Sequence, residues 1–429
     1  MQLDAPESPR AIRAKLRAAT CLLLTAVAPR LAHSADAPPM PKPDPSPTSQ
    51  IDLTGLFYSE RIRVLEPTIR YTRNYFSGRS FFGQLSIDSV TGASPTGTLP
   101  SGQIQTITSA SGRTRQLAAT DIPTAEFSDT RIAVDASVHQ PVKMFAFTLG
   151  GHFSHEKDYQ SEGVTGDVAI DLNHKLTTLN LGGGYNSDSV FPVGGTSVGL
   201  SPPGTLTGVP SNPKHVKSAL VGLTQVVSRR WLVGLSGSLA TEDGYLTDPY
   251  KVLSVVDART GVPLTELSEQ RPDSRERKSV QADSIYHFES NILYLSYRRY
   301  WDDWGIGSNT IDARYRLPRG TLGFLEPHLR FYTQTAADFY RFGLIEGAPL
   351  PQYATSDYRM TAFQSLTLGA TVGFAPGGRR ATSEWTVRAE YIGQFGNGSP
   401  PGTVGVQTTM DLFPRVNVFS LVLNYRFKR

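Results

Sequence analysis

The C-terminal segment 416–427 constrains the fold most strongly, because its apolar side chains recur at every second residue. The side chains that share this face are Phe419, Leu421, Leu423, Tyr425 and Phe427. One apolar face suits a strand in contact with lipid, and a terminal aromatic strand lets an outer-membrane β-barrel close its first strand on its last. Lys428 and Arg429 follow the last aromatic residue, which departs from a strictly terminal Phe. The segment therefore predicts a membrane-spanning closing strand.

The N-terminus has the pattern of a secretory signal peptide. Basic residues precede a short apolar run at 18–28, and small residues follow at 32–34. The run falls short of the roughly 18 apolar residues that a spanning helix needs, so we expect cleavage after Ser34 rather than an anchor. The single cysteine, Cys21, lies near the beginning of the run. The mature chain therefore has no disulfide and no Cys-based metal site, and lipidation is not expected.

The formal net charge of +4 belongs mostly to this leader. Up to Ser34, the basic residues Arg10, Arg13, Lys15, Arg17 and Arg30 stand against Asp4 and Glu7, which gives 5 − 2 = +3. The remaining chain carries +1 and is nearly neutral. It therefore lacks the basic surface of a nucleic-acid-binding protein, and no nucleic-acid partner is expected.

The composition divides the chain into three parts. We expect a signal peptide at 1–34, a proline-rich periplasmic linker at 35–51 and an outer-membrane β-barrel at 52–429. Prolines dominate segment 38–47, which favours an extended, semi-rigid spacer. A proline-rich ligand for another domain is the alternative interpretation of this segment.

From Asp52 onward the chain consists of segments in which polar and apolar residues alternate. In 130–139, for example, Ile132 and Val134 share one face and Arg131 and Asp135 share the other. About sixteen such segments follow one another, within the even-numbered range of bacterial barrels. They are 52–59, 62–73, 80–90, 129–139, 143–153, 164–173, 176–186, 215–228, 230–241, 275–287, 290–300, 308–317, 322–334, 358–374, 382–394 and 414–427.

The connections between these segments indicate their direction. Long connections (91–128, 187–214, 242–274, 335–357 and 395–413) all follow odd-numbered strands. Short turns follow even-numbered strands, at 140–141, 173–174, 228–229, 318–320 and 376–378. This parity predicts an all-β, antiparallel up-and-down transmembrane barrel with both termini in the periplasm. A soluble sandwich of this length would normally split into domains. It would also lack a shared water-filled interior toward which the charged faces of about sixteen strands could point.

If the apolar faces contact lipid, the opposite faces line the lumen. Residues of both charge signs occur there. Such residues either line an aqueous channel or pair with one another in an interior filled by side chains. About sixteen strands enclose more space than side chains alone fill, which favours an aqueous passage. Connection 91–128 either narrows that passage or forms a mobile external loop. The predicted lumen-facing residues are Arg131, Asp135, His139, Asp167, Asp171, Asp312, Arg314, Arg316, His328, Arg330, Arg388, Glu390 and Arg426.

Two runs carry residues that suggest chemistry. In 297–305, Asp302 and Asp303 could help to bind a divalent cation, although aromatic residues in an interfacial girdle explain the run more simply. In 152–158, His152 and Ser154 lie two residues apart, as in outer-membrane phospholipases. The Asn-Gly that follows the serine in those enzymes is missing, and Ser154 would face the lumen rather than lipid. We therefore expect no enzymatic activity, no cofactor and no metal.

Four ordered strings resemble one family. They are DSVTGASP at 88–95, HEKDY at 155–159, YRRYWDDWGI at 297–306 and YTQTAADFY at 332–340. Together they resemble an uncharacterised family of predicted Gram-negative outer-membrane proteins, with similarity from about Leu53 to the C-terminus. The resemblance implies an outer-membrane barrel and supplies no catalytic residues.

These observations favour a passive, porin-like channel for small polar solutes in the outer membrane. Its partners would be outer-membrane lipid, the barrel assembly machinery during biogenesis and the solutes themselves. A closed structural or partner-docking barrel of an envelope complex is the alternative, and an outer-membrane lipid hydrolase comes third.

Overall fold

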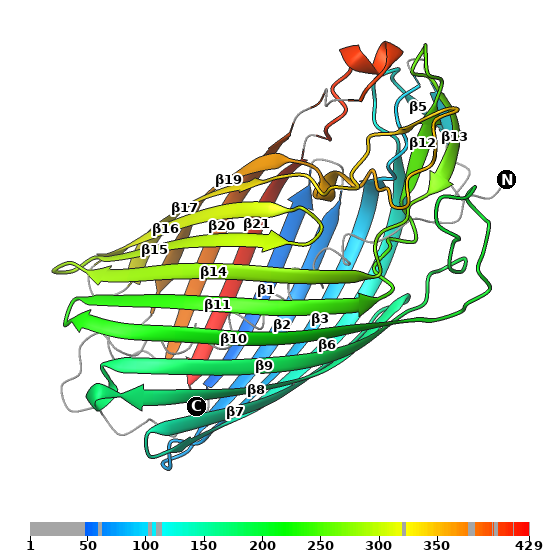
Figure 1. Ribbon diagram of the computed structural model, residues 1–429. Helices are drawn as coiled ribbons and strands as arrows, with labels where there is room; N and C mark the ends of the chain where they lie inside the picture. The colour runs from blue at the N-terminus through cyan, green and yellow to red at the C-terminus, as the bar shows by residue number, and fades with distance from the viewer. Residues whose placement is uncertain are drawn as a thin grey trace.

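The structure is a computed structural model that describes residues 48–58, 62–101, 105–108, 114–319, 323–375, 382–396, 398, 402–414 and 416–428. The predicted signal peptide and residues 35–47 of the predicted linker lie outside this part. Sixteen strands form one closed antiparallel barrel with up-and-down strand order (Figure 1). This confirms the predicted fold class. Within the described residues, no helix is both long and apolar enough to cross a membrane.

Each barrel strand corresponds to one predicted segment. In barrel order the strands are β1 (Thr48–Tyr58), β2 (Arg63–Asn74), β3 (Ser80–Pro95), β6 (Thr124–Val142), β7 (Phe145–His155), β8 (Tyr159–Leu172), β9 (Thr177–Val190), β10 (Asn212–Ser228), β11 (Trp231–Gly244), β14 (Ser274–His287), β15 (Ile292–Asp302), β16 (Gly307–Arg319), β17 (Gly323–Gln334), β19 (Phe363–Phe374), β20 (Ser383–Gly396) and β21 (Val416–Lys428).

The barrel closes where the C-terminal strand predicted it would. β21 pairs antiparallel with β1, and Thr48 lies opposite Lys428 while Phe57 lies opposite Phe419. The described chain therefore begins and ends at one end of the barrel, the end that also carries the short turns (Figure 1). The long connections lie at the other end. That the short-turn end faces the periplasm remains a prediction.

The alternating sequence gives the strands two different faces. Side chains such as Leu149 (70% exposed), Ile69 (53%) and Leu368 (51%) form an apolar face that is open to the surroundings. The opposite face, which we call the polar face, carries charged and hydroxyl side chains. Exposed apolar residues on every strand would be unfavourable in water but are stable in contact with lipid. The barrel is therefore of the outer-membrane type.

Some predicted boundaries were wrong. A turn was expected at Gln140–Pro141, but β6 continues through Pro141, which lies opposite Ala146, and the chain turns at residues 143–144. The pairing of β6 with β3 ends at His139, so the missing N–H of Pro141 interrupts no bond on that side. β19 begins at Phe363 rather than at 358, because a short 3-10 helix, Tyr358–Met360, precedes it. Two further 3-10 helices are Asn173–Lys175 and Gly405–Thr409.

The long connections pack on one another in a layer that we call the loop layer. It comprises the described parts of 96–123, 191–211, 245–273, 335–362 and 397–415. Within it β13 (Pro263–Ser268), β12 (Val252–Val256) and β18 (Leu344–Ile345) form a small sheet, and β4 (Gln105–Thr108) pairs with β5 (Thr114–Leu117). One apolar cluster joins three connections through Leu99, Val256, Met410 and Leu412. Another contains Leu253, Leu267, Leu344 and Ala354.

Candidate functional site

The thirteen predicted lumen residues all lie on the polar face, because side chains alternate between the two faces along each strand and their apolar neighbours point the other way. Arg131 is buried, whereas Arg314, Arg330, Arg388 and Arg426 are exposed and the others are partly buried. The structure does not bring them together into one site. It places most of them in two networks and in several separate ion pairs.

The first network joins β16, β17 and β20 through a histidine. His328 Nε2 lies 2.8 Å from Asp312 Oδ2, and its Nδ1 lies 2.8 Å from Glu390 Oε1. Two carboxylates at this distance are satisfied together only when both ring nitrogens donate, so the geometry fits the imidazolium form. β19 lies between β17 and β20, and it presents Gly369 opposite both His328 and Glu390. The missing side chain lets Glu390 reach His328 across the intervening strand.

Arginines stack on aromatic rings beside this network. The Arg316 guanidinium lies 4.0 Å from the Phe324 ring centroid, and Arg314 lies 5.2 Å from that of Tyr294. Arg316 Nε also donates to Glu326 Oε2 at 2.6 Å. These contacts hold the guanidinium planes against the wall, since both stacking and charge pairing fix their orientation.

The second network begins at β1, beside the seam of the barrel, and runs to β7. Arg70 on β2 donates to Asp52 on β1 at 2.5 Å and to Gln84 on β3 at 2.6 Å. Gln84 in turn donates to Asp135 on β6, which pairs with His152 on β7 at 2.6 Å. Five consecutive strands are thus linked by side chains on one face. Arg131 pairs separately with Asp88, and both are buried.

A buried ionic network ties two connections of the loop layer together. Arg271 Nη2 donates to Asp357 Oδ2 at 2.9 Å and to Glu269 Oε2 at 3.1 Å. Arg359 pairs with Asp357 and with Asp248, the latter at 2.8 Å. Burial alone would raise the pKa of the Asp357 carboxyl, but the guanidiniums of Arg359 and Arg271 hold it well below its usual range. Burial raises the pKa of Glu269, and the charge of Arg271 offsets this in part.

The described start of connection 91–128 also belongs to the loop layer. Leu99 is 5% exposed, and its N–H donates to the Ser254 hydroxyl at 2.9 Å. The hydroxyl of Thr98 donates to the Glu266 carboxylate at 2.5 Å. This stretch is therefore docked on β12 and β13, which contradicts the interpretation of its start as a mobile loop.

The aromatic and acidic run 297–305 has a structural explanation. Asp302 accepts hydrogen bonds from Arg275 and from the backbone N–H groups of Trp304 and Ile306. Its carboxylate is thus occupied by protein donors, which leaves little for a cation. Asp303 instead accepts from the backbone of Glu276.

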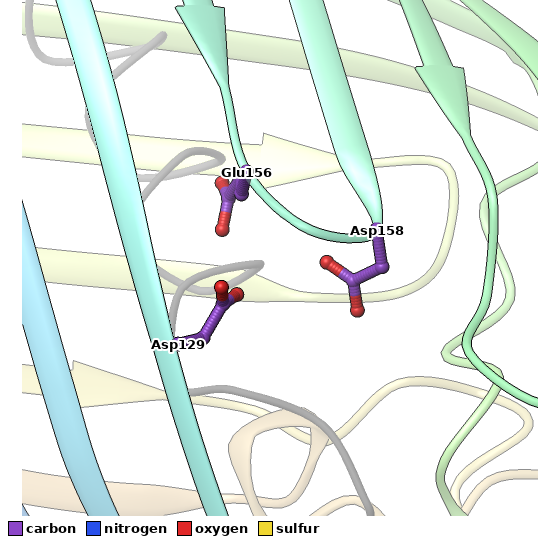
Figure 2. Close-up of side chains that lie close together, drawn as sticks. All are labelled: Asp129, Glu156 and Asp158. Carbon is purple, nitrogen blue, oxygen red and sulfur yellow. The ribbon is translucent and has the colours of Figure 1, made fainter.

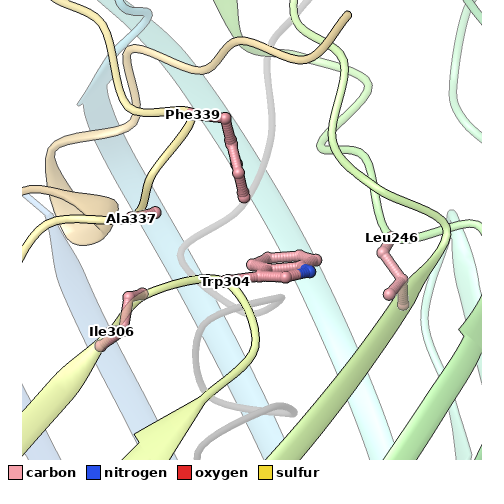
Figure 3. Packing of buried hydrophobic residues seen from close by; sticks show 5 residues of the cluster. All are labelled: Leu246, Trp304, Ile306, Ala337 and Phe339. Carbon is pink, nitrogen blue, oxygen red and sulfur yellow. The ribbon is translucent and has the colours of Figure 1, made fainter.

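Trp304 does not lie in an interfacial girdle, as had been expected of the aromatics in this run. It is 3% exposed and packs edge-on against Phe339, with ring centroids 5.0 Å apart. Figure 3 shows that Ile306 from the same turn and Leu246 and Ala337 from neighbouring connections complete this cluster. Trp301 is 38% exposed, as a girdle residue would be. The run therefore anchors the loop layer to the rim of the barrel.

An acidic group lies beside the histidine and serine of β7. The carboxylates of Asp129, Glu156 and Asp158 each offer an oxygen within 4.8 Å of the others, and the side chains point toward a shared space (Figure 2). Oxygen ligands of this kind suit calcium or magnesium. Asp158 also accepts a hydrogen bond from the Tyr250 hydroxyl at 2.7 Å. Burial raises the pKa of Asp158, and the negative charge of Asp129 adds to this.

The sequence interpretation missed Asp129 as a neighbour of Glu156 and Asp158. The register of the β6–β7 hairpin would have revealed this neighbour, because Ile132 pairs with His155. Extending that register by three residues sets Asp129 opposite Asp158. The misplaced turn at Gln140–Pro141 concealed this alignment.

The family model described as "Protein of unknown function (DUF3570)" matches residues 13–427. The chain belongs to this family. The match confirms the resemblance carried by the four strings. No protein with curated annotation matches the sequence significantly.

Several crystal structures of Pseudomonas aeruginosa proteins are similar to this chain at a low level. OccK5 (OpdH) has a TM-score of 0.39 and 10% identity, covering 90% of this chain and 98% of its own. OccK1 (OpdK) has a TM-score of 0.40 and 9% identity, with coverage of 90% and 98%. The ferric enterobactin receptor PfeA, in complex with enterobactin, has a TM-score of 0.42 and 9% identity, with coverage of 90% and 60%. At this similarity none of them indicates a solute for this chain.

Proposed function

We propose that this outer-membrane barrel is a passive channel for small polar solutes and that its polar face lines the lumen. One observation carries the proposal: arginines on the polar face keep much of their surface exposed. The side chain of Arg314 is 47% exposed, and those of Arg388 and Arg426 are each 49% exposed. A side-chain-filled interior would bury them, whereas a water-filled interior leaves them solvated. Barrels of sixteen strands are wide enough to hold such water.

The charges on the polar face are unevenly distributed around the barrel. Acidic residues dominate β6 to β9, with Asp135, Asp167, Asp171 and Asp188. Arginines are concentrated on β14 to β21, at 275, 277, 298, 314, 316, 330, 388 and 426, where they outnumber the acidic residues at 283, 302, 312, 326, 384 and 390. In a closed ring of sixteen strands, strands eight apart face each other, so β6 faces β16 and β9 faces β20. A solute between these walls would experience a transverse field that favours molecules carrying both signs of charge.

Single-channel recording tests the proposal. The refolded mature protein would be inserted into a planar bilayer after heat-modifiable gel mobility has shown that the barrel has formed. Discrete conductance steps are expected. A folded barrel that stays silent would contradict the channel.

The reversal potential in a salt gradient tests the role of the arginine wall. The double variant Arg314→Gln, Arg388→Gln should shift selectivity toward cations, because it removes positive charge from the proposed lumen. The double variant Arg299→Gln, Lys278→Gln is the matched control, since Arg299 lies on the apolar face of β15 and Lys278 on that of β14. Equal shifts in both variants would count against a lumen role for the polar face.

The loop layer favours a second candidate, a barrel that docks an envelope partner. Its buried ionic network and apolar clusters give it the fixed shape that a docking surface needs. A folded, silent barrel would favour this function over the channel. Deleting residues 38–47 tests the contribution of the proline-rich segment, and unchanged recovery of partners in pull-downs would exclude that segment as the docking element.

A further inference from the structure

The two ends of the barrel differ in charge. In the described connections of the short-turn end, the basic residues are Arg79, Lys143, Lys175, Arg229 and Arg230, and the acidic residue is Glu289. At the other end the longest loop, 245–273, has the opposite balance. Its acidic residues Asp248, Asp257, Glu266, Glu269 and Asp273 outnumber Lys251, Arg259 and Arg271. The short-turn end is therefore the cationic end.

Two more arginines extend this positive surface along the barrel wall. Arg73 ends the apolar face of β2, and Arg319 ends that of β16. We call the seven residues the basic rim: Arg73, Arg79, Lys143, Lys175, Arg229, Arg230 and Arg319. All seven are exposed, and Lys175 keeps 63% of its side chain exposed beside Asp171 at 3.9 Å.

Exposed aromatic residues fix the depth of the basic rim. Phe76 is 74% exposed between Arg73 and Arg79, and Trp231 is 41% exposed directly after Arg230. The Arg73 guanidinium lies 5.3 Å from the ring centroid of Tyr75. Aromatic residues at strand ends sit at the boundary between hydrocarbon and headgroups. Cations beside them are therefore at the depth of lipid phosphates rather than in bulk water.

Two lysines of the basic rim occupy unfavourable backbone positions. Lys143 has φ = 55° and Lys175 has φ = 69°. Such left-handed conformations in tight turns favour Gly, Asn or Asp, and any other residue there costs conformational energy. Lysine at these two positions therefore lowers the local stability of the turns. This cost indicates that the positive charges serve a function.

We propose that the basic rim binds the headgroups of anionic phospholipids in the leaflet at the short-turn end. The phosphate charge of such lipids is not cancelled by a cation in the headgroup and complements clustered Lys and Arg, and their acyl chains complement the aromatic and aliphatic side chains just above. A soluble acidic protein would meet the cations but would leave the aromatic residues uncovered. The inference rests on the outer-membrane placement of the barrel and does not depend on its being a channel.

Spin-labelled lipids test the proposal on the full-length folded protein. Electron paramagnetic resonance would compare how strongly spin-labelled phosphatidylglycerol and phosphatidylcholine are immobilised at the barrel in phosphatidylcholine bilayers. We expect a preference of roughly fivefold for phosphatidylglycerol at low salt, falling as salt is added. The rim variant Lys143→Gln, Lys175→Gln, Arg229→Gln, Arg230→Gln should reduce the preference to about one, since most of the clustered charge is removed.

The control variant removes four exposed cations near the other end: Lys157→Gln, Lys217→Gln, Arg259→Gln and Arg341→Gln. It changes the net charge equally and should keep the preference. Heat-modifiable mobility would show that both variants fold. No preference in the unmodified protein, a preference that survives in the rim variant, or its loss in the control variant would each overturn the proposal. Silence in conductance recordings would affect only the channel, so the two failures are distinguishable.

Discussion

At the scale of single residues, an absent side chain can matter as much as a charged one. A Cβ at Gly369 would lie 2.5 Å from Glu390 Cγ and 2.7 Å from the backbone oxygen of Ala389. Both distances are shorter than real contacts, and the backbone oxygen cannot turn away as a flexible side chain does. Gly369 therefore creates the space in which Glu390 reaches His328.

We predict that Gly369→Ala lowers the free energy of unfolding by about 1–3 kcal/mol, because overpacking and loss of the Glu390 contact act together. Urea unfolding of the barrel in detergent or lipid would measure the change. Gly166→Ala on β8 is the matched control, since a Cβ there meets nothing within 4 Å. Equal unfolding midpoints for the two variants would show that the space at Gly369 is not required.

At the scale of elements, the stability of the loop layer depends on buried charged side chains. Asp357 has a lower pKa in the folded state than in the unfolded chain because of Arg359 and Arg271. Such a group stabilises the fold above about pH 4, and this stabilisation is lost as the pH falls further. Glu269, whose pKa is raised, favours the folded state on acidification and opposes the effect.

We predict that Asp357→Asn loosens the loop layer at pH 7, because it leaves the buried guanidinium of Arg271 and the partly buried one of Arg359 short of a counter-charge. Its remaining stability should also change less between about pH 4 and pH 2 than that of the unmodified protein. Hydrogen exchange in 245–273 and 335–362, corrected for its intrinsic pH dependence, would report both effects. Glu346→Gln on an exposed part of the same connection should behave like the unmodified protein. Identical exchange in the two variants would refute the role of Asp357.

At the scale of the whole molecule, the apolar face must match the bilayer. Leu149 lies near the middle of β7 and is 70% exposed, so it should sit near the centre of the hydrocarbon layer. Leu149→Arg should destabilise the barrel in lipid by about 2–4 kcal/mol. Ser137→Arg is its control, because Ser137 lies on the polar face opposite Gly150, which leaves room for the side chain. Reversible unfolding in lipid vesicles would measure both, and a smaller loss for Leu149→Arg than for Ser137→Arg would contradict the assignment of the two faces.

The sequence by itself determined the barrel. Alternation of period two specified which side chains share a face in all sixteen strands, and the parity of connection lengths specified their up-and-down order. Both signals are local, since they depend only on neighbouring residues and on distance along the chain. The assignment of charged residues such as Asp312 and Arg388 to one common face followed from the same period.

The partners of those residues were decided only by the tertiary structure. Glu390 meets His328 because register sets Gly369 between them, and Asp129 meets Asp158 because the chain turns after β6 three residues later than the sequence predicted. The sequence of the loop layer has no repeating pattern, so it does not predict the contact between Arg271 and Asp357. Periodic strands reveal their faces through the geometry of an extended backbone, whereas contacts between distant segments depend on register and on loop paths that the closed barrel alone brings together.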